Sequence, residues 1–247
     1  MNPLTVAYAS DRNLYKYLPM AINSLLMHNP DARVYVFAED DEIESLRHPN
    51  VTVIKDTVFD GMIKETSPQF NYYLPRATFA RLWLAKVLKE DRVLWLDVDT
   101  IVDDDLTDLW NMDIGEDNYI AGTYDKGALI FNIGIDVAYY INAGVILMDL
   151  DKWRKLGLVA RCTKLVNNIK FRFGDQDIIN VACDGHIKRL SAQYNYSRVT
   201  RTDGIEKPAI YHFASHPKLW EIWDLVPTDY PDLMALWDKY YTESLAN

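Results

Sequence analysis

One stretch, from Arg92 to Leu106, constrains the fold of this 247-residue chain more than any other. It opens with a run of apolar residues, Val93 to Leu96, that passes directly into Asp97-Val98-Asp99. A short run without polar residues is typical of a central strand that is buried on both faces of a parallel sheet. Residues two apart in an extended backbone point to the same side. We therefore expect the carboxylates of Asp97 and Asp99 to lie together at the carboxyl end of this strand.

This pair of carboxylates predicts a site for a divalent cation. Ligands of open α/β sheets bind at the carboxyl ends of the strands, and two adjacent carboxylates repel each other unless a cation lies between them. Oxygen ligands at this density suit a hard ion such as Mg²⁺ or Mn²⁺. An Asp-x-Asp pair is also typical of a solvated acidic turn, and the sequence leaves that alternative open. The acidic triplet Asp103 to Asp105 is better explained by a turn with a helix cap at Asp105.

Strands and helices alternate over the first hundred residues, which predicts an α/β fold with a mostly parallel, Rossmann-like sheet and flanking helices. The loop from Asp60 to Leu74 contains turn residues and aromatics and is a candidate active-site loop. We treat residues 1–247 as a single domain, with 219–247 as an aromatic, acidic C-terminal segment packed on it. Apolar periodicity predicts strands at Leu4–Ala9, Arg33–Ala38, Val51–Ile54, Val93–Leu96, Tyr119–Tyr124, Val145–Met148, Ile187–Leu190 and Ala209–His212, and helices at Tyr17–His28, Glu42–Arg47, Arg76–Leu88, Leu106–Trp110, Trp153–Lys170 and Ile178–Ala182.

The charge and cysteine content narrow the function classes. A net charge of −10 argues against nucleic acid as a partner and predicts repulsion from anionic membranes. Cys162 and Cys183 are far apart and form no CxxC motif, which favours reduced thiols in a cytoplasmic protein. The N-terminus lacks the pattern of a signal peptide, and no apolar run reaches the ~20 residues that a membrane span needs. Packing of the aromatic tail on another subunit is left open, so a homo-oligomer is one expectation.

Several motifs stand in a fixed order along the chain. They are Ala9-Ser10-Asp11-Arg12-Asn13, Thr78-Phe79-Ala80-Arg81-Leu82, Asp97-Val98-Asp99, Asn142-Ala143-Gly144-Val145, Asp175-Gln176-Asp177 with Asn180, and His212 with Lys218 and Trp220. As a set, from about Val6 to Trp220, they resemble glycosyltransferase family eight. Its members are retaining nucleotide-sugar enzymes and include bacterial lipooligosaccharide galactosyl- and glucosyltransferases and glycogenin. The resemblance implies a GT-A fold and a divalent metal, usually Mn²⁺ with Mg²⁺ as the alternative, that bridges the enzyme and the donor diphosphate.

The resemblance also implies roles for individual residues. The residues that match metal ligands are Asp97, Asp99 and His212. On the nucleotide side, Asp11 and Asn13 match contacts to uracil and ribose, Asp97 and Val98 fall in the donor-binding motif, and Lys218 matches a diphosphate contact. The pocket for the donor sugar is matched by Arg81, Asn142, Gly144, Asp175 and Gln176, and Asp125 falls where family members approach the sugar or the acceptor. Two positions depart from the pattern, since Arg12 stands where an Asp is common and Ser215 replaces a Gly.

The implied reaction moves a hexose, glucose or galactose, from a UDP-sugar to a sugar hydroxyl of a glycan acceptor, such as a cell-surface polysaccharide or lipooligosaccharide precursor. An oxocarbenium-like centre needs anionic or amide oxygens nearby, and Asp175 and Gln176 supply both types. The sequence leaves open which of them attacks covalently, or whether the acceptor enters on the leaving-group side and a phosphate oxygen takes its proton. A nucleotidyltransferase that makes a sugar nucleotide would be expected to have a glycine-rich, basic loop directly after the first strand. It is disfavoured because Ala9–Tyr17 lacks glycine. A catalytically inactive relative is disfavoured because every ligand type of the metal set is present.

Overall fold

The computed structural model describes residues 3–40, 43, 46–69, 76–127, 139–197, 200, 204–214 and 235–241. Its strands are β1 (Thr5–Ser10), β2 (Arg33–Ala38), β3 (Val51–Lys55), β4 (Arg92–Leu96), β5 (Thr100–Val102), β6 (Ile120–Tyr124), β7 (Ile141–Asp149), β8 (Ile187–Arg189) and β9 (Ile210–His212). Its α-helices are α1 (Leu18–His28), α2 (Arg76–Phe79), α3 (Leu84–Val87), α4 (Thr107–Trp110), α6 (Leu150–Lys155), α7 (Leu158–Asn168) and α8 (Asp175–Cys183), and short 3-10 helices cover Arg12–Tyr17, Asp56–Phe59, Ala80–Trp83 and Ala192–Tyr194.

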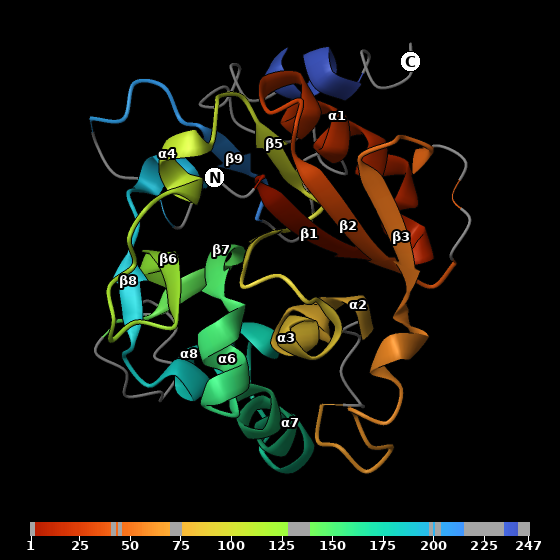
Figure 1. Cartoon of the computed structure of the whole chain (residues 1–247), viewed down its shortest axis with the longest axis vertical. Helices are drawn as coiled ribbons and strands as arrows, with labels where there is room; N and C mark the ends of the chain where they lie inside the picture. The colour runs from red at the N-terminus through yellow and green to blue at the C-terminus, as the bar shows by residue number, and fades with distance from the viewer. Residues whose placement is uncertain are drawn as a thin grey trace.

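A seven-stranded sheet with the order β3-β2-β1-β4-β7-β6-β8 forms the centre of the molecule (Figure 1). The strands β3, β2, β1 and β4 run parallel, β7 runs antiparallel to both β4 and β6, and β8 is parallel to β6. The prediction of a mostly parallel sheet is confirmed. Because β1 and β4 are parallel neighbours, their carboxyl ends lie at the same edge of the sheet.

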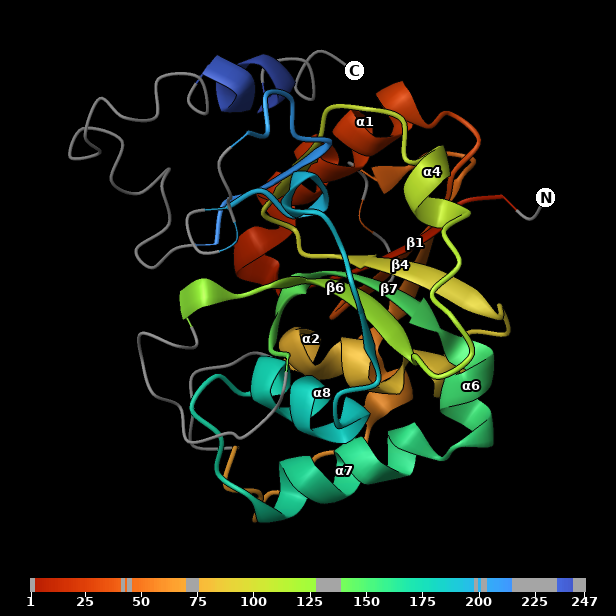
Figure 2. The ribbon, with the colours of Figure 1, turned by 90° about the vertical axis from the view of Figure 1, so that its left-hand side faces the viewer.

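Layers of helix cover both faces of the sheet (Figure 2). The helix α1 and the small sheet of β5 and β9 lie on one face, and α2, α6, α7 and α8 lie on the other. The central position of β4 explains the apolar run Val93–Leu96. Leu94 and Leu96 pack in the hydrophobic core that includes α1, and Val93 and Trp95 pack in the core that includes α7 and α8. None of the four residues is more than 1% exposed. Successive side chains of a central strand point to opposite faces, so both faces require apolar residues.

Two of the predicted helices are interrupted. The stretch predicted as one helix over Arg76–Leu88 divides into α2, a 3-10 turn and α3, with Arg81 in the 3-10 turn. There the Nε of Arg81 donates to the carbonyl oxygen of Thr78 at 3.2 Å, so this side chain stays near the backbone instead of pointing to solvent. The helix predicted over Trp153–Lys170 starts earlier and breaks at Gly157, where φ is +68°, a conformation that glycine adopts without steric cost.

Smaller differences concern helix ends and segments outside the described residues. Thr107–Trp110 is helical, but Leu106 is its N-cap; the carboxylate of Asp105 instead accepts the backbone N–H of Thr107 at 2.7 Å. Near the C-terminus, Trp237 packs edge-on against Tyr17 of the first 3-10 helix, with ring centroids 5.6 Å apart. Much of the helix predicted over Glu42–Arg47, the end of the loop Asp60–Leu74, and most of the segment 219–247 lie outside the described residues.

Candidate active site

The acidic pair lies in a turn and not in a continuing strand. The strand β4 ends at Leu96, and the backbone N–H of Thr100 donates to the carbonyl oxygen of Asp97 at 3.2 Å. The expectation that Asp97 and Asp99 share one side of an extended strand is therefore wrong in its geometry. The carboxylates still converge, because the turn leads into β5, which pairs antiparallel with β9 and sets His212 opposite Thr100.

Asp97, Asp99 and His212 form the one group of potential metal ligands found among the described residues, with ligand atoms within 4.8 Å of one another. The Nε2 atom of His212 lies 3.4 Å from Oδ1 of Asp99 and 3.8 Å from Oδ2 of Asp97. Two carboxylates and one imidazole make a donor set that accepts a divalent cation with affinity for both oxygen and nitrogen. The three residues lie together, as expected, and their arrangement is compatible with a metal site. The chemistry of the set fits the expected Mn²⁺.

A buried asparagine sets the orientation of the histidine. The Nδ1 atom of His212 lies 2.9 Å from Oδ1 of Asn195, and Asn195 is fully buried. Because the amide Nδ2 of Asn195 donates to Oδ1 of Asn142 at 3.0 Å, its Oδ1 is the acceptor, and we assign the imidazole proton to Nδ1. The lone pair of Nε2 is then directed at the two carboxylates, as a metal ligand requires. Asn195, which lies between Tyr194 and Tyr196, carries no sequence signal for this role.

Gly144 gives the imidazole its space. A Cβ atom at this position would overlap the ring of His212. In the structure Gly144 lies within β7, where its carbonyl oxygen accepts the backbone N–H of Asp97 at 2.8 Å. The small residue is required because β7 and the ring of His212 are in contact.

Arg81 connects the acidic pair to α8. The residue is 5% exposed, and its guanidinium contacts two carboxylates: Nη2 lies 2.7 Å from Oδ1 of Asp97, and Nε lies 2.9 Å from Oδ2 of Asp175. Its Nη1 also donates to the carbonyl oxygen of Ala143, and its plane lies over the ring of Trp95, with 4.5 Å from Cζ to the ring centroid. Arg81 therefore forms buried contacts and not a surface salt bridge. Because Arg81 takes Oδ1 of Asp97, the other oxygen remains directed at His212.

Asp175 begins α8, and Gly174 is the N-cap, so helix capping does not explain this aspartate. Its side chain is buried against Arg81. Burial raises the pKa of Asp175 to about 7, the positive charge of Arg81 opposes this shift, and the negative charge of Asp97 adds to it.

The next residue, Gln176, is fixed by hydrogen bonds at both ends of its amide. Its Oε1 accepts from the backbone N–H of Ala143 at 3.0 Å and from Nδ2 of Asn142 at 3.3 Å. Its Nε2 donates to Oδ2 of Asp125 at 3.1 Å and lies 3.3 Å from the hydroxyl of Tyr140. Asp125 also accepts from Nδ2 of Asn142 at 3.2 Å. The structure therefore joins Asp125, Asn142 and Gln176 into one network, which Asn195 continues to His212.

The remaining predicted residues lie further along the same sheet edge or outside the description. The carboxylate of Asp11 caps the 3-10 helix after β1 and accepts from the backbone N–H groups of Asn13 and Leu14 at 3.0 and 3.2 Å. The side chain of Asn13 is exposed, whereas Val98 is 5% exposed and packs in the core. Lys218 lies outside the described residues.

Comparison with solved structures defines the class of protein. The galactosyltransferase LgtC, crystallised with donor and acceptor sugar analogues, superposes with a TM-score of 0.73 and 25% identity, over 98% of this chain and 95% of its own. The glycosyltransferase GlyE of Streptococcus pneumoniae superposes with a TM-score of 0.72 and 24% identity, over the whole of this chain and 63% of its own. The fold is the GT-A fold of glycosyltransferases.

Comparison of sequences then gives the family. The family model described as glycosyl transferase family 8 matches residues 5–224, and the chain belongs to this family. A Haemophilus influenzae protein named as a glycosyltransferase is 28% identical over 246 residues, which are 88% of this chain and 73% of that protein. Glycosyltransferase GlyF of Streptococcus pneumoniae is 28% identical over 248 residues, and the match covers 90% of this chain but only 58% of GlyF. Within the described residues, no helix is both long and apolar enough to cross a membrane.

Proposed function

We propose that this family member transfers a hexose, glucose or galactose, from a UDP-sugar to a sugar hydroxyl of a glycan acceptor, with metal dependence and with retention at the anomeric carbon. The observation that carries the proposal is the contact between two sets of side chains: a metal-ligand set of Asp97, Asp99 and His212, and a polar network centred on Gln176. LgtC, which shares the fold, is a galactosyltransferase crystallised with donor and acceptor sugar analogues. A cell-surface glycan precursor as acceptor and a cytoplasmic location remain predictions from the sequence.

The metal-ligand set supplies the leaving-group side of the site. Asp97, Asp99 and His212 would hold a divalent cation, with Mn²⁺ favoured because an imidazole joins two carboxylates. When bound, such a cation supplies Lewis-acid neutralisation of the charge on the donor diphosphate. Arg81 keeps Asp97 oriented through the 2.7 Å contact, and Lys218 adds a point charge for the diphosphate in this proposal. Asp11 and Asn13, at the end of the neighbouring strand β1, bind the nucleoside.

The second network supplies the sugar side. We assign Gln176 to the contact with the donor sugar, because its partly exposed amide is held by four neighbours in one orientation. Asp175 is a positioning residue that acts through Arg81, since its Oδ2 is paired and its side chain is buried. A carboxylate in this position is poorly placed to attack. This supports the route in which the acceptor oxygen bonds to the anomeric carbon, the carbon–oxygen bond to the diphosphate breaks on the same face, and a phosphate oxygen of UDP takes the proton.

The test measures UDP release from UDP-glucose or UDP-galactose in the presence of Mn²⁺. We expect Asp97→Asn and Asp99→Asn to abolish release. The melting temperature of Asp99→Asn in chelator should stay near that of the wild type, because removing one of two repelling carboxylates relieves repulsion. Asp97→Asn also removes the charge paired with the buried Arg81 at 2.7 Å, so this variant should melt lower. The matched control is Asp108→Asn, an exposed acidic residue of α4. Near-normal UDP release by either site variant at low Mn²⁺ would contradict the metal assignment. Formation of UTP and a hexose 1-phosphate when pyrophosphate is added to the UDP-sugar would indicate a nucleotidyltransferase. A β-linked product from an α-linked donor would contradict retention.

A further inference from the structure

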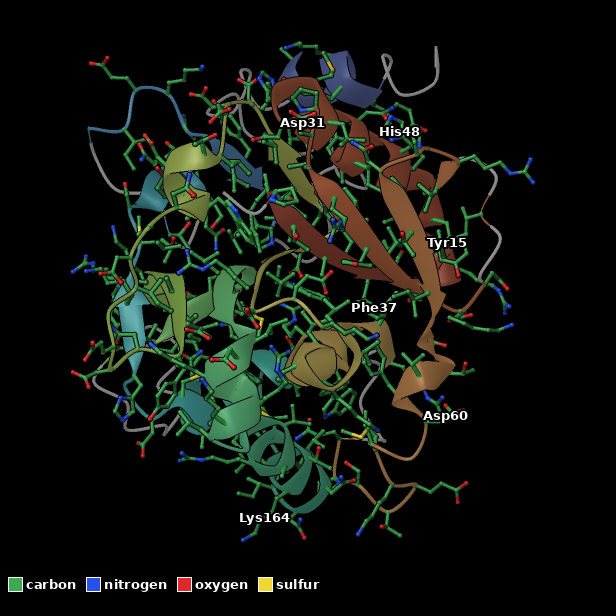
Figure 3. All side chains as sticks on the ribbon, in the orientation of Figure 1. Tyr15, Asp31, Phe37, His48, Asp60 and Lys164 are labelled. Carbon is green, nitrogen blue, oxygen red and sulfur yellow. The ribbon has the colours of Figure 1, made fainter. Side chains whose placement is uncertain are left out.

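A strongly basic segment surrounds α7 in a chain whose net charge is −10. Between Lys152 and Arg172 there are seven Lys or Arg residues and no Asp or Glu. The helix α7 lies at the lower edge of the molecule in Figures 1 and 2, and Figure 3 shows Lys164 at this outer edge. Positive charge is thus concentrated around α7, although the chain as a whole is negatively charged.

The fold brings further cations to this face. A groove of about 730 Å³ is lined by residues of α3, α6 and α7 and of the loop 62–64, and it includes Lys64, Lys86, Arg154 and Lys164 but no carboxylate. All four side chains belong to exposed residues. We define the basic face as the set Lys64, Lys86, Arg154, Lys155, Arg161 and Lys164, together with the exposed apolar residues Leu156 and Ile169.

Only part of this positive charge is paired. Arg154 lies 3.1 Å from Asp91, Lys155 lies 2.6 Å from Asp151, and Arg161 lies 3.5 Å from Asp184. The described residues offer no carboxylate within ion-pair distance of Lys64, Lys86 and Lys164. Exposed ion pairs are weak and exchange readily with other partners. The face therefore keeps a positive field close to its surface.

Apolar side chains are exposed at both ends of α7. The helix buries Leu158, Cys162 and Val166 against the domain. Leu156, just before the helix, is 54% exposed, and Ile169, just after it, is 45% exposed. A soluble polyanion has no apolar surface that could bury these side chains. The boundary between lipid headgroups and acyl chains accepts cations and apolar side chains together.

We propose that the basic face docks on an anionic phospholipid membrane. The repulsion expected from the net charge of the whole chain does not prevent this, because salt screens charges beyond roughly 8–10 Å. Each Lys or Arg close to an anionic leaflet favours binding. The charge of the local face, and not the net charge of the chain, therefore determines whether the membrane attracts or repels the protein.

The docked orientation sets residues 60–69, the described part of the candidate active-site loop, beside the lipid. The hydroxyl of Ser67 donates to the carbonyl oxygen of Val166 at 2.6 Å, and Nε2 of Gln69 donates to that of Ile169 at 2.9 Å. These bonds hold residues 60–69 against the C-terminal end of α7. If the proposed function holds, an acceptor glycan carried on a lipid would approach this loop from the membrane. That step rests on the proposed function, whereas membrane binding itself does not.

The experiment is cosedimentation of the full chain, in chelator and without donor, with vesicles of phosphatidylcholine alone or of phosphatidylcholine with phosphatidylglycerol. We expect binding to the anionic vesicles alone, and loss of binding as salt rises. The double variant Lys86→Glu/Lys164→Glu should partition at least about 30-fold more weakly, from about 1 kcal/mol for each cation removed. The control Lys188→Glu/Lys207→Glu makes the same change of charge at exposed positions on β8 and in the segment before β9, and should bind like the wild type.

Several outcomes would overturn the proposal: no binding to anionic vesicles at low salt, equal loss in both double variants, or binding to soluble polyglutamate without binding to vesicles. Melting temperatures of the two double variants in chelator establish that both are folded. Because no donor or metal is present, a failure here leaves the UDP-release test unaffected, and a failure of that test leaves this one unaffected.

Discussion

The substitution Asn195→Ala tests whether the orientation of His212 controls metal binding. It removes the acceptor of the imidazole Nδ1–H, 2.9 Å away, and the donor to Asn142, 3.0 Å away. Loss of a residue that orients a metal-ligand histidine typically weakens metal affinity about 10–100-fold. That range corresponds to about 1.4–2.8 kcal/mol. We expect the Mn²⁺ concentration for half-maximal activity to rise by this factor, with much of the rate recovered at saturating Mn²⁺.

The same substitution also lowers stability without metal. Both hydrogen bonds are buried, and leaving a buried polar group without its partner costs about 1–3 kcal/mol. For a chain of this size, each kcal/mol lowers the melting temperature by about 2–4 °C. The free energy of unfolding alone therefore cannot distinguish a positioning residue from a structural one, and the Mn²⁺ titration provides the distinction.

Asn180→Ala is the matched control. Asn180 is also a fully buried asparagine. Its side chain bonds the backbone N–H and C=O of Ile141 at 2.8 and 3.0 Å and forms no hydrogen bond with His212. We expect the control to lose a similar amount of stability with unchanged Mn²⁺ affinity, measured directly from free Mn²⁺ in solution. If Asn195→Ala and Asn180→Ala both melt lower and both bind Mn²⁺ like the wild type, Asn195 is structural and the reasoning is refuted.

Three further predictions follow from the site and the core. Gly144→Ala should weaken Mn²⁺ binding and lower the melting temperature, because its Cβ would overlap the ring of His212; unchanged affinity would mean that the imidazole relocates without cost. Burial raises the pKa of Asp175 from 3.8 to about 7, so the folded state holds a proton that the unfolded chain releases between pH ~4 and ~7. Melting scans in chelator should therefore show the wild type losing stability relative to Asp175→Asn as the pH rises through this window, and a constant difference would contradict the shift. Cys162 and Cys183 are buried free thiols, and burial raises the pKa of Cys162 to about 12, so a thiol reagent should label them only on unfolding; rapid labelling of the native protein would contradict their burial.

Much of the fold could be predicted from local patterns. The strand Arg33–Ala38 was predicted with its observed bounds, and the apolar run Val93–Leu96 is the core of β4. Helix continuity was harder to predict, because apolar periodicity continues across Gly157 and across the 3-10 turn that contains Arg81. The break at Gly157 depends on a positive φ that a lone glycine permits but does not require.

The candidate site divides in a similar way. Asp97 and Asp99 could be found because they follow a strand directly, and His212 because the family resemblance aligned it with them. Asn195 could not be found, since its role exists only through contacts with His212 and Asn142, which are 17 and 53 residues away in the sequence. A common polar residue carries no signal of such contacts without the fold.

The two halves of the site are connected by hydrogen bonds and not merely adjacent. From His212 the path passes through Asn195 to Asn142, and from there to Gln176. A second path passes from Asp97 through Arg81 to Asp175, the residue before Gln176. Asn195, which orients His212, therefore shares the partner Asn142 with Gln176, and substitutions at Asn195 and Gln176 should not act independently. The buried guanidinium of Arg81 also contacts two carboxylates at once, so this position is a poor one for lysine, which cannot hold both in fixed geometry.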